Sequence, residues 1–199
     1  HDLGKTNAST FTDDQHKDMK VDYIMANPPF NLKKWREENE LIGDYRWSGY
    51  CGKQNAPRVS NANYAWILHM ISKLDVNHGI AGFLLANGAL GDMDDYEIRK
   101  NILLKDKVEA IIVLPRDMFY TTDISVTLWI INMNKRAGTV NGRKVRDRQH
   151  EVLFMDLRTW DNNIEEITID KGKKKKKTVL TDSQIAKIKE VYNNWQSPD

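Results

Sequence analysis

The sequence of 199 residues contains a single cysteine, Cys51. One cysteine can form neither an internal disulfide nor a cysteine-based zinc cluster, so both are excluded. No stretch of about eighteen apolar residues occurs, which excludes a membrane-spanning helix. Metal-ligand spacing is also missing, and we expect no metal site among the histidines, which are His1, His16, His69, His78 and His150. A reduced, cytoplasmic setting is the expected one.

The sequence also has no large excess of positive or negative charge. The sequence has 30 Lys and Arg against 28 Asp and Glu, a net charge of +2, which indicates no particular partner. Hydrophobic residues make up 40% and charged residues 29%, a balance typical of globular proteins. The charge is unevenly spread, because residues 1–134 carry a net −3 and residues 135–178 a net +6. This shift predicts a near-neutral main body over 1–134 and a basic extension over 135–199.

The main body alternates between two patterns. Apolar runs predict strands over 21–26, 80–86, 108–114 and 126–132. Helical spacing of apolar residues and acidic start signals predict helices over 63–74 and about 94–105. Buried strands separated by helices are typical of an α/β sheet with helices on both faces.

The extension has different signals. Asn141-Gly142 predicts a tight hairpin turn, and residues 152–157 predict one more strand. A capping box at residues 181–184 predicts a final helix reaching Trp195. Five consecutive lysines over 173–177 repel one another and predict an exposed loop. This run and the basic hairpin 143–148 are candidates for contact with DNA phosphates, a solvated surface being the alternative.

The tetrapeptide Asn27-Pro28-Pro29-Phe30 directly follows the first predicted strand. Its prolines fix φ and stiffen a loop at the carboxyl end of a strand, where open α/β sheets bind ligands. The Asn27 amide and the Pro28 carbonyl offer acceptors, and Phe30 offers a flat apolar face. Together they suit an exocyclic amino group on a planar ring. A strand-ending turn with a capping Asn and a core Phe is the alternative for the tetrapeptide alone.

The tetrapeptide and residues 22–26 before it resemble motif IV of amino-methyltransferases that use S-adenosylmethionine. Further segments are similar, in order, to the modification subunit of type I restriction–modification systems; they are residues 26–31, 61–67, 84–88, 97–100, 114–122 and 180–195. The resemblance implies the carboxyl-side part of a doubly wound, Rossmann-like methyltransferase sheet. Residues 1–134 would then be the C-terminal portion of the catalytic domain, and residues 135–199 a small extension.

The resemblance also implies an activity, which is methyl transfer from S-adenosylmethionine to the amino nitrogen of an adenine flipped out of duplex DNA. It assigns Asn27 and the Pro28 carbonyl to the amino group and Phe30 to stacking on the base. Phe119 or Tyr120 is the candidate for the opposite face of the base. Orientation rather than a strong base would supply most of the rate. The implied partners are double-stranded DNA and the specificity and restriction subunits of the same system.

The sequence departs from the family on the cofactor side. The glycine-rich cofactor loop that precedes motif IV in the family is missing, and Ser9 stands where an Asp is expected to contact the cofactor's adenine. The chain also begins at His1 rather than at a methionine. We therefore expect a piece of a longer protein that binds S-adenosylmethionine poorly and is inactive alone.

Two other functions share these features. An RNA-guanine or protein-glutamine methyltransferase can use the same tetrapeptide, although the similarities after residue 60 favour DNA. A non-catalytic module that binds DNA or a partner is the second alternative. Trp35, Trp47 and Tyr50 follow the tetrapeptide, where they either contact the base or DNA or anchor a long loop. Cys51 lies in the same loop, and we expect an inert thiol.

Overall fold

The computed structural model of the chain describes residues 10–119, 123–160, 163–168 and 174–198, with only the backbone at residues 163, 164, 167 and 175. The elements, with η for 3-10 helices, are β1 (Tyr23–Ala26), η1 (Tyr45–Trp47), η2 (Gly52–Gln54), α1 (Asn63–Lys73), β2 (Ile80–Ala86), η3 (Asn87–Leu90), α2 (Tyr96–Leu104), β3 (Val108–Val113), β4 (Val126–Asn132), β5 (Gly138–Val140), β6 (Arg143–Val145), β7 (Leu153–Asp156), β8 (Asn163–Thr168), β9 (Lys174–Val179) and α3 (Asp182–Gln196). Each strand and helix expected from the sequence is present, and β8 and β9 are additional.

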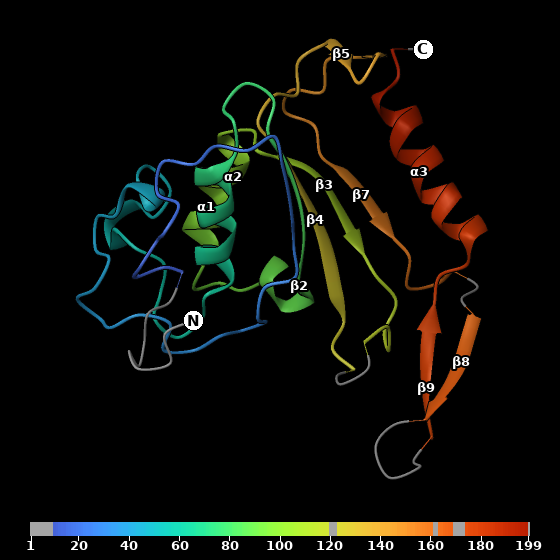
Figure 1. Cartoon of the computed structure of the whole chain (residues 1–199), viewed down its shortest axis with the longest axis horizontal. Coiled ribbons are helices and arrows are strands. Elements are labelled where there is room, and N and C mark those ends of the chain that lie inside the picture. Colours follow the sequence, from blue (N-terminus) through green and yellow to red (C-terminus); the bar gives the residue numbers. More distant parts are fainter. Residues whose placement is uncertain (1–9, 120–122, 161–162, 169–173, 199) are drawn as a thin grey trace.

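Five strands form one mixed sheet in the order β1-β2-β4-β3-β7 (Figure 1). β1 runs parallel to β2, and β7 runs parallel to β3. β4 follows both β2 and β3 in the chain yet lies between them, antiparallel to each. The carboxyl ends of β1, β2, β3 and β7 therefore meet at one edge of the sheet, which we call the carboxyl edge. The opposite edge is the amino edge.

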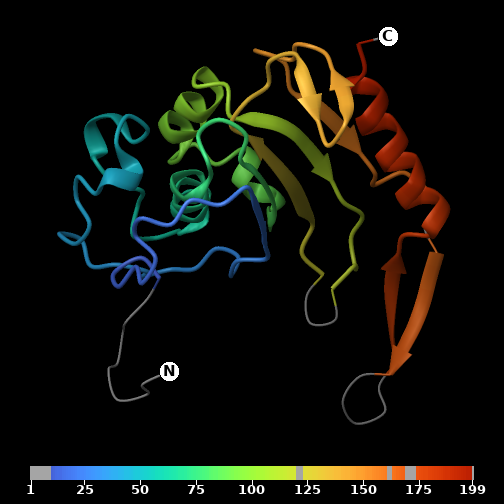
Figure 2. The same ribbon diagram turned by 45° about the horizontal axis from the view of Figure 1, so that its top comes forward.

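Helices cover both faces of this sheet (Figures 1 and 2). On one face, α1 and α2 pack over side chains that include Phe83 and Trp129, whose rings stack 6.4 Å apart. On the other face, α3 covers β3 and β7, where Ile112 and Met155 pack with Ile188. The predicted α/β class with helices on both faces is confirmed. No helix in the described parts of the chain is long and apolar enough to cross a bilayer.

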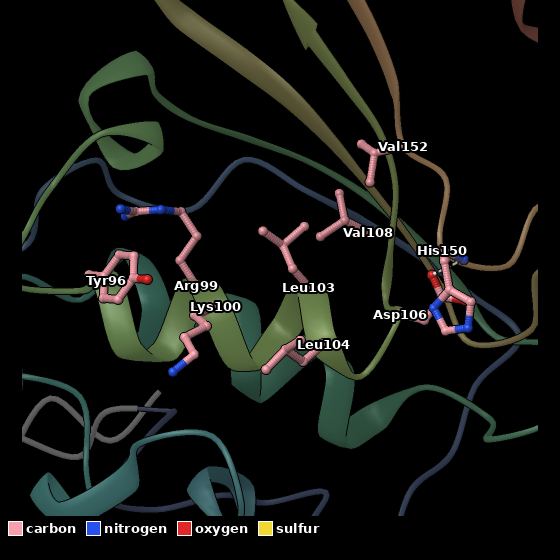
Figure 3. A pocket seen from close by; sticks show the side chains of 9 residues that line it. All are labelled: Tyr96, Arg99, Lys100, Leu103, Leu104, Asp106, Val108, His150 and Val152. Carbon is pink, nitrogen blue, oxygen red and sulfur yellow. Dashed lines mark hydrogen bonds between the residues drawn. The ribbon is translucent and has the colours of Figure 1, made fainter.

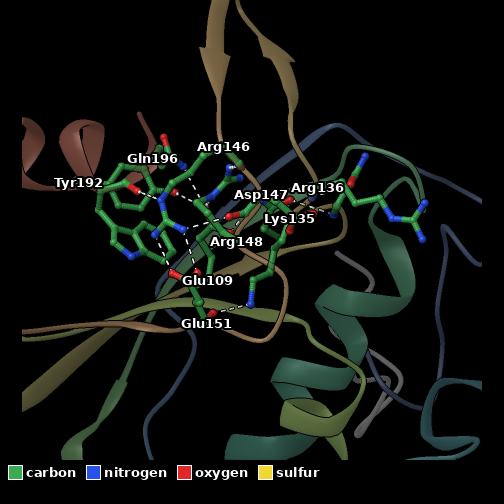
Figure 4. Close-up of polar contacts among 12 residues, drawn as sticks. Glu109, Lys135, Arg136, Arg146, Asp147, Arg148, Glu151, Tyr192 and Gln196 are labelled. Carbon is green, nitrogen blue, oxygen red and sulfur yellow. Dashed lines mark hydrogen bonds and ion pairs between the residues drawn. The ribbon is translucent and has the colours of Figure 1, made fainter. Parts of the chain in front are cut away.

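A buried charged network joins α3 to the sheet (Figure 4). Glu109 interrupts the apolar run of β3 and has no exposed surface. Its carboxylate accepts hydrogen bonds from Arg148 Nε at 3.1 Å, from Asn132 Nδ2 at 3.2 Å and from Gln196 Nε2 at 2.9 Å. Because Gln196 is the last residue of α3, these bonds hold the end of the helix on the sheet.

Two local predictions for the extension are confirmed. Asn141 and Gly142 both have positive φ, at 49° and 77°, as a two-residue hairpin turn between β5 and β6 requires. At the start of α3, Thr181 and Gln184 exchange both hydrogen bonds of the capping box.

The lysine run forms a strand instead of the exposed loop that the sequence predicts. β9 pairs antiparallel with β8, and Lys176 and Lys177 lie opposite Glu166 and Glu165. Successive side chains of a strand point to opposite faces, and the facing carboxylates offset the repulsion between the ammonium groups. The loop interpretation is therefore wrong for residues 174–177, and Lys173 lies outside the described residues.

Candidate active site

The tetrapeptide 27–30 begins at the carboxyl edge, where β1 makes its last backbone pair at Ala26. Pro28 is buried, while Asn27 and Pro29 are exposed. Within the residues that the structure describes, neither the Asn27 amide nor the Pro28 carbonyl makes a hydrogen bond. No described residue therefore occupies these two acceptors, which belong to consecutive residues of a backbone whose φ the prolines restrict.

Phe30 meets Phe119, which comes from the loop after β3. The two ring centroids lie 5.9 Å apart and the ring planes are nearly perpendicular, at 89°. Both rings are half-buried. The structure thus brings together two of the residues predicted to stack on a base, but edge to face and in contact. A base can lie between them only after one ring turns away.

Three asparagines hold the segment that follows Phe30. The backbone N–H of Asn31 donates to Asn63 Oδ1 at 3.0 Å, and Asn63 Nδ2 donates back to Asn31 Oδ1 at 2.9 Å. Asn61 Nδ2 donates to the same Asn31 Oδ1 at 3.1 Å. We call Asn31, Asn61 and Asn63 the asparagine bracket. Sequence reasoning assigned it no role, although Asn31 adjoins the tetrapeptide and the other two share one similar segment.

The aromatic residues after the tetrapeptide anchor their loop. Trp35 and Trp47 are buried, and Trp35 packs edge-on against Phe11 with ring centroids 4.6 Å apart. Tyr50 packs against the same core and is half-buried. Of the two roles that the sequence allowed, anchoring is the one these contacts support, because a buried tryptophan offers no face to an incoming base.

Arg58 ties this loop to the start of α2. Its guanidinium pairs with Asp92, with Asp94 at 2.6 Å and with Asp95 at 2.9 Å. Burial raises the pKa of Asp95, and the neighbouring Arg58 opposes that effect. These three carboxylates therefore pair with Arg58, and none of them caps the helix through its side chain. The helix α2 begins at Tyr96, later than its predicted start near residue 94.

The chain's thiol is not placed as a nucleophile. Cys51 is buried, and burial together with Asp95 raises the pKa of its thiol to about 12. A thiol with such a pKa stays protonated near neutrality and is a poor nucleophile. Among the described residues, no group of three or more His, Cys, Asp or Glu side chains has the geometry to hold a metal ion.

A groove of about 540 Å³ lies beside α2 and the start of β3 (Figure 3). The residues that line it include Arg99, Leu103, Val108 and His150. The first residue of β3 is at the amino edge, so this groove does not belong to the tetrapeptide site.

Two predicted site residues lie outside the described parts of the chain. They are Ser9, the candidate for cofactor contact, and Tyr120, the alternative to Phe119.

A mixed sheet with one inserted antiparallel strand and Asn-Pro-Pro-Phe at its carboxyl edge defines an α/β methyltransferase fold. The chain matches the methyltransferase subunit of a type I restriction–modification system from Streptococcus thermophilus with a TM-score of 0.73 and 26% identity. The match covers 96% of this chain and 35% of that one.

The chain belongs to the N-6 DNA methylase family, whose model matches residues 1–199. It is 38% identical to the methylase subunit of the type I restriction enzyme HindI from Haemophilus influenzae, over 100% of this chain and 39% of that subunit. It is 34% identical to the MjaIX methylase subunit from Methanocaldococcus jannaschii, over 94% of this chain and 30% of that subunit. The family that the sequence motifs indicated is confirmed, and the chain spans between 30% and 39% of these relatives.

Proposed function

We propose that this chain forms the target-base side of a DNA methyltransferase that methylates the amino nitrogen N6 of adenine. The observation that carries the proposal is that no described residue bonds to the Asn27 amide oxygen or the Pro28 carbonyl, two acceptors that directly precede Phe30 within the tetrapeptide. Membership of the N-6 DNA methylase family supports the same activity. We assign the enzyme to the cytoplasm.

The amino group of adenine has two N–H donors and therefore matches two adjacent acceptors. Asn27 accepts one hydrogen and the Pro28 carbonyl accepts the other, which increases the electron density on the nitrogen and orients it. Pro29 keeps the loop stiff, so that the geometry is set before the base arrives. Orientation of this kind supplies most of the rate without a general base.

A flipped base needs an aromatic surface to replace the stacking that it loses in the duplex. Phe30 provides one face. Phe119, or its neighbour Tyr120, provides the other after the contact between Phe30 and Phe119 opens.

S-adenosylmethionine is the proposed methyl donor of the whole protein. The described residues before the tetrapeptide contain no glycine, so they do not form the glycine-rich loop that holds the cofactor in the family. Among the described residues, β1 also has no neighbouring strand on its outer side. Further segments of the protein therefore supply most of the cofactor site, with Ser9 as the contribution of this chain.

Double-stranded DNA and the specificity and restriction subunits are the proposed partners, by analogy with the type I systems of the relatives. The lysine strand β9 is linked to the loop that carries Phe119. The backbone N–H of Thr178 in β9 donates to the carbonyl of Asp117 at 2.9 Å, and Asp117 is in the loop that carries Phe119. Lysines placed there can contact phosphates next to the flipped base.

The test is a methyl-transfer assay on the full-length protein with labelled S-adenosylmethionine, unmethylated DNA and the specificity subunit. Asn27→Ala is the variant, and Asn77→Ala, an exposed residue in the turn before β2, is the matched control. N6-methyladenine is the expected product of the wild type and of the control, with none from Asn27→Ala.

Two other results contradict the proposal. Label in RNA or in protein identifies the alternative methyltransferases with the same tetrapeptide. No label anywhere, from a folded protein with its partner present, identifies a non-catalytic module.

A further inference from the structure

We infer that the asparagine bracket is a positioning device that holds the tetrapeptide in the orientation needed to receive the target base. This inference rests on the proposed function of Asn27 and Phe30. It concerns Asn31, Asn61 and Asn63, which do not touch the base in the proposed mechanism but determine where the loop stands.

The hydrogen bonds of the bracket leave each amide a single orientation. Backbone N–H groups only donate, so the Asn63 atom facing the N–H of Asn31 is an oxygen. The other amide atom of Asn63 is then a nitrogen, and the Asn31 atom that it faces is an oxygen. Asn61 is fixed in the same way, because its oxygen accepts from the backbone N–H of Asn63 at 2.9 Å. The Asn31 oxygen therefore accepts two hydrogen bonds.

The backbone of Asn31 requires such support. Its φ is 53°, in the left-handed region that costs a non-glycine residue free energy unless neighbouring contacts compensate. The N–H to Asn63 Oδ1 bond and the two bonds to its side chain compensate at this residue, directly after Phe30. The prolines restrict one end of the loop and the bracket fixes the other.

Asn63 serves the loop rather than its own helix. It is the first residue of α1, yet its side chain points back to Asn31 while the N-cap residue, Ala62, has no capping side chain. Asn63 is 2% exposed, and α1 is anchored in the core through Ile67 and Leu68. The bracket thus connects the tetrapeptide to the rigid part of the molecule.

A second pair of contacts keeps the two loop segments side by side. The N–H of Ala62 donates to the carbonyl of Leu32 at 2.9 Å, and the N–H of Lys34 donates to the carbonyl of Val59 at 3.0 Å. These bonds hold the loop near α1 when the bracket is broken, so a bracket variant is expected to fold and to misplace the tetrapeptide locally. A displacement of about 1 Å in a reacting group can lower a rate about 100-fold.

The experiment compares Asn63→Asp with Asn31→Asp in the full-length protein with its specificity subunit and DNA. Both variants add one negative charge within the same cluster. Asn63→Asp replaces a donor with an oxygen facing the Asn31 oxygen, whereas Asn31→Asp keeps an acceptor for both donors and tolerates positive φ. Single-turnover methyl transfer, DNA affinity and the fluorescence of 2-aminopurine at the target position are measured for each.

We expect Asn63→Asp to slow methyl transfer between about 10-fold and 100-fold with little change in DNA affinity, and to lower the flipped-base fluorescence signal. Asn31→Asp is expected to retain the rate within about threefold, as the conservative exchange. Asn134→Asp, in the turn after β4 at the amino edge, is the control for charge and leaves the rate unchanged. Equal losses in Asn63→Asp and Asn31→Asp, or a wild-type rate in Asn63→Asp, overturn the inference.

Asn31→Gly covers the case in which Asn63→Asp does not fold. Residue 31 is exposed, and glycine adopts positive φ without strain, so this variant removes only the side-chain acceptor. A slowed transfer step supports the bracket, and a wild-type rate overturns it. Failure of the wild type to methylate adenine contradicts the proposed function itself, which separates the two results.

Discussion

Glu109 and Arg148 bring opposite charges into the space between the sheet and α3, with side chains 0% and 1% exposed. Glu109→Gln leaves the guanidinium of Arg148 buried without its carboxylate. Because breaking one partner of a buried pair costs about 3–5 kcal/mol, we expect a loss of that size in the free energy of unfolding. Urea unfolding followed by tryptophan fluorescence measures it.

Glu151→Gln is the matched control for this change. Glu151 pairs with Arg146 at 2.6 Å in the same region, but its side chain is 47% exposed, so we expect a loss below about 1 kcal/mol. Equal losses in the two variants contradict the role of burial.

His69 makes stability depend on pH. Burial lowers the pKa of its imidazole to about 4, and the neighbouring Arg46, whose Nη1 lies 3.2 Å from His69 Nδ1, adds to this effect. The pKa in the unfolded chain is about 6.5, so the unfolded state binds a proton that the folded state lacks between these values. Stability is therefore lost as the pH falls from about 6.5 toward 4.

The check on His69 is the slope of the unfolding free energy against pH in the wild type and in His69→Asn. Asparagine keeps an acceptor for Arg46 but does not titrate. We expect a smaller slope in the variant over this window, and identical slopes assign the pH dependence to other groups.

At the scale of single elements, the lysine strand β9 gives a prediction for the proposed DNA contact. Replacing Lys174, Lys176 and Lys177 with glutamine removes three charges. Each lost phosphate contact lowers the slope of log affinity against log salt concentration by about 0.9, so we expect a decrease of up to about 3. A DNA-binding titration at several salt concentrations measures this slope, and methyl transfer at saturating DNA serves as the second readout.

Lys100, Lys105 and Lys144 provide the control for that change. They are exposed on α2, just after it and on β6, away from the carboxyl edge. Their replacement with glutamine removes the same charge and is expected to leave the slope unchanged. A similar decrease in both triple variants indicates a general charge effect and not a DNA-binding strand.

The elements differ in how far the sequence predicts them. β2, β3 and β4 were predictable because each carries a nearly continuous run of apolar residues, which is visible in the local sequence without knowledge of its neighbours in the sheet. The strand β9 was not predictable in this way. The repulsion among its lysines favours a loop, and the carboxylates of Glu165 and Glu166 that offset this repulsion lie in another segment of the chain.

The candidate site also has parts that the sequence predicts and parts that it does not. The tetrapeptide was identifiable from its four residues, and Phe119 from a similar segment. The contact between Phe30 and Phe119, and the bracket between Asn31 and Asn63, join residues far apart in the chain. Contacts between residues so far apart leave no periodic pattern in a sequence, so only the fold reveals them.

At the scale of the whole molecule, one sheet separates two hydrophobic clusters. Leu68 belongs to the cluster under α1 and α2, and Met155 to the smaller one under α3. Because β3 and β4 contribute to both faces, we expect one unfolding transition. Leu68→Ala should lower the unfolding free energy by about 2–5 kcal/mol, and Met155→Ala by less because its cluster is smaller.

Circular dichroism and tryptophan fluorescence give the test of this cooperativity. Coincident transitions from both probes, shifted together in each variant, are the expected result. A separate early transition in Met155→Ala alone contradicts it, because α3 would then unfold independently of the sheet.

The place of β4 between β2 and β3 also determines the order in which a nascent chain can assemble. β2, α1, α2 and β3 all leave the ribosome before β4, and β2 and β3 have no direct pairing that joins them. The centre of the sheet therefore closes only when residue 132, the end of β4, has emerged. Until then the pair β1-β2 and the single strand β3 have no strand to join them, and β7 is added at the edge of the sheet only afterwards.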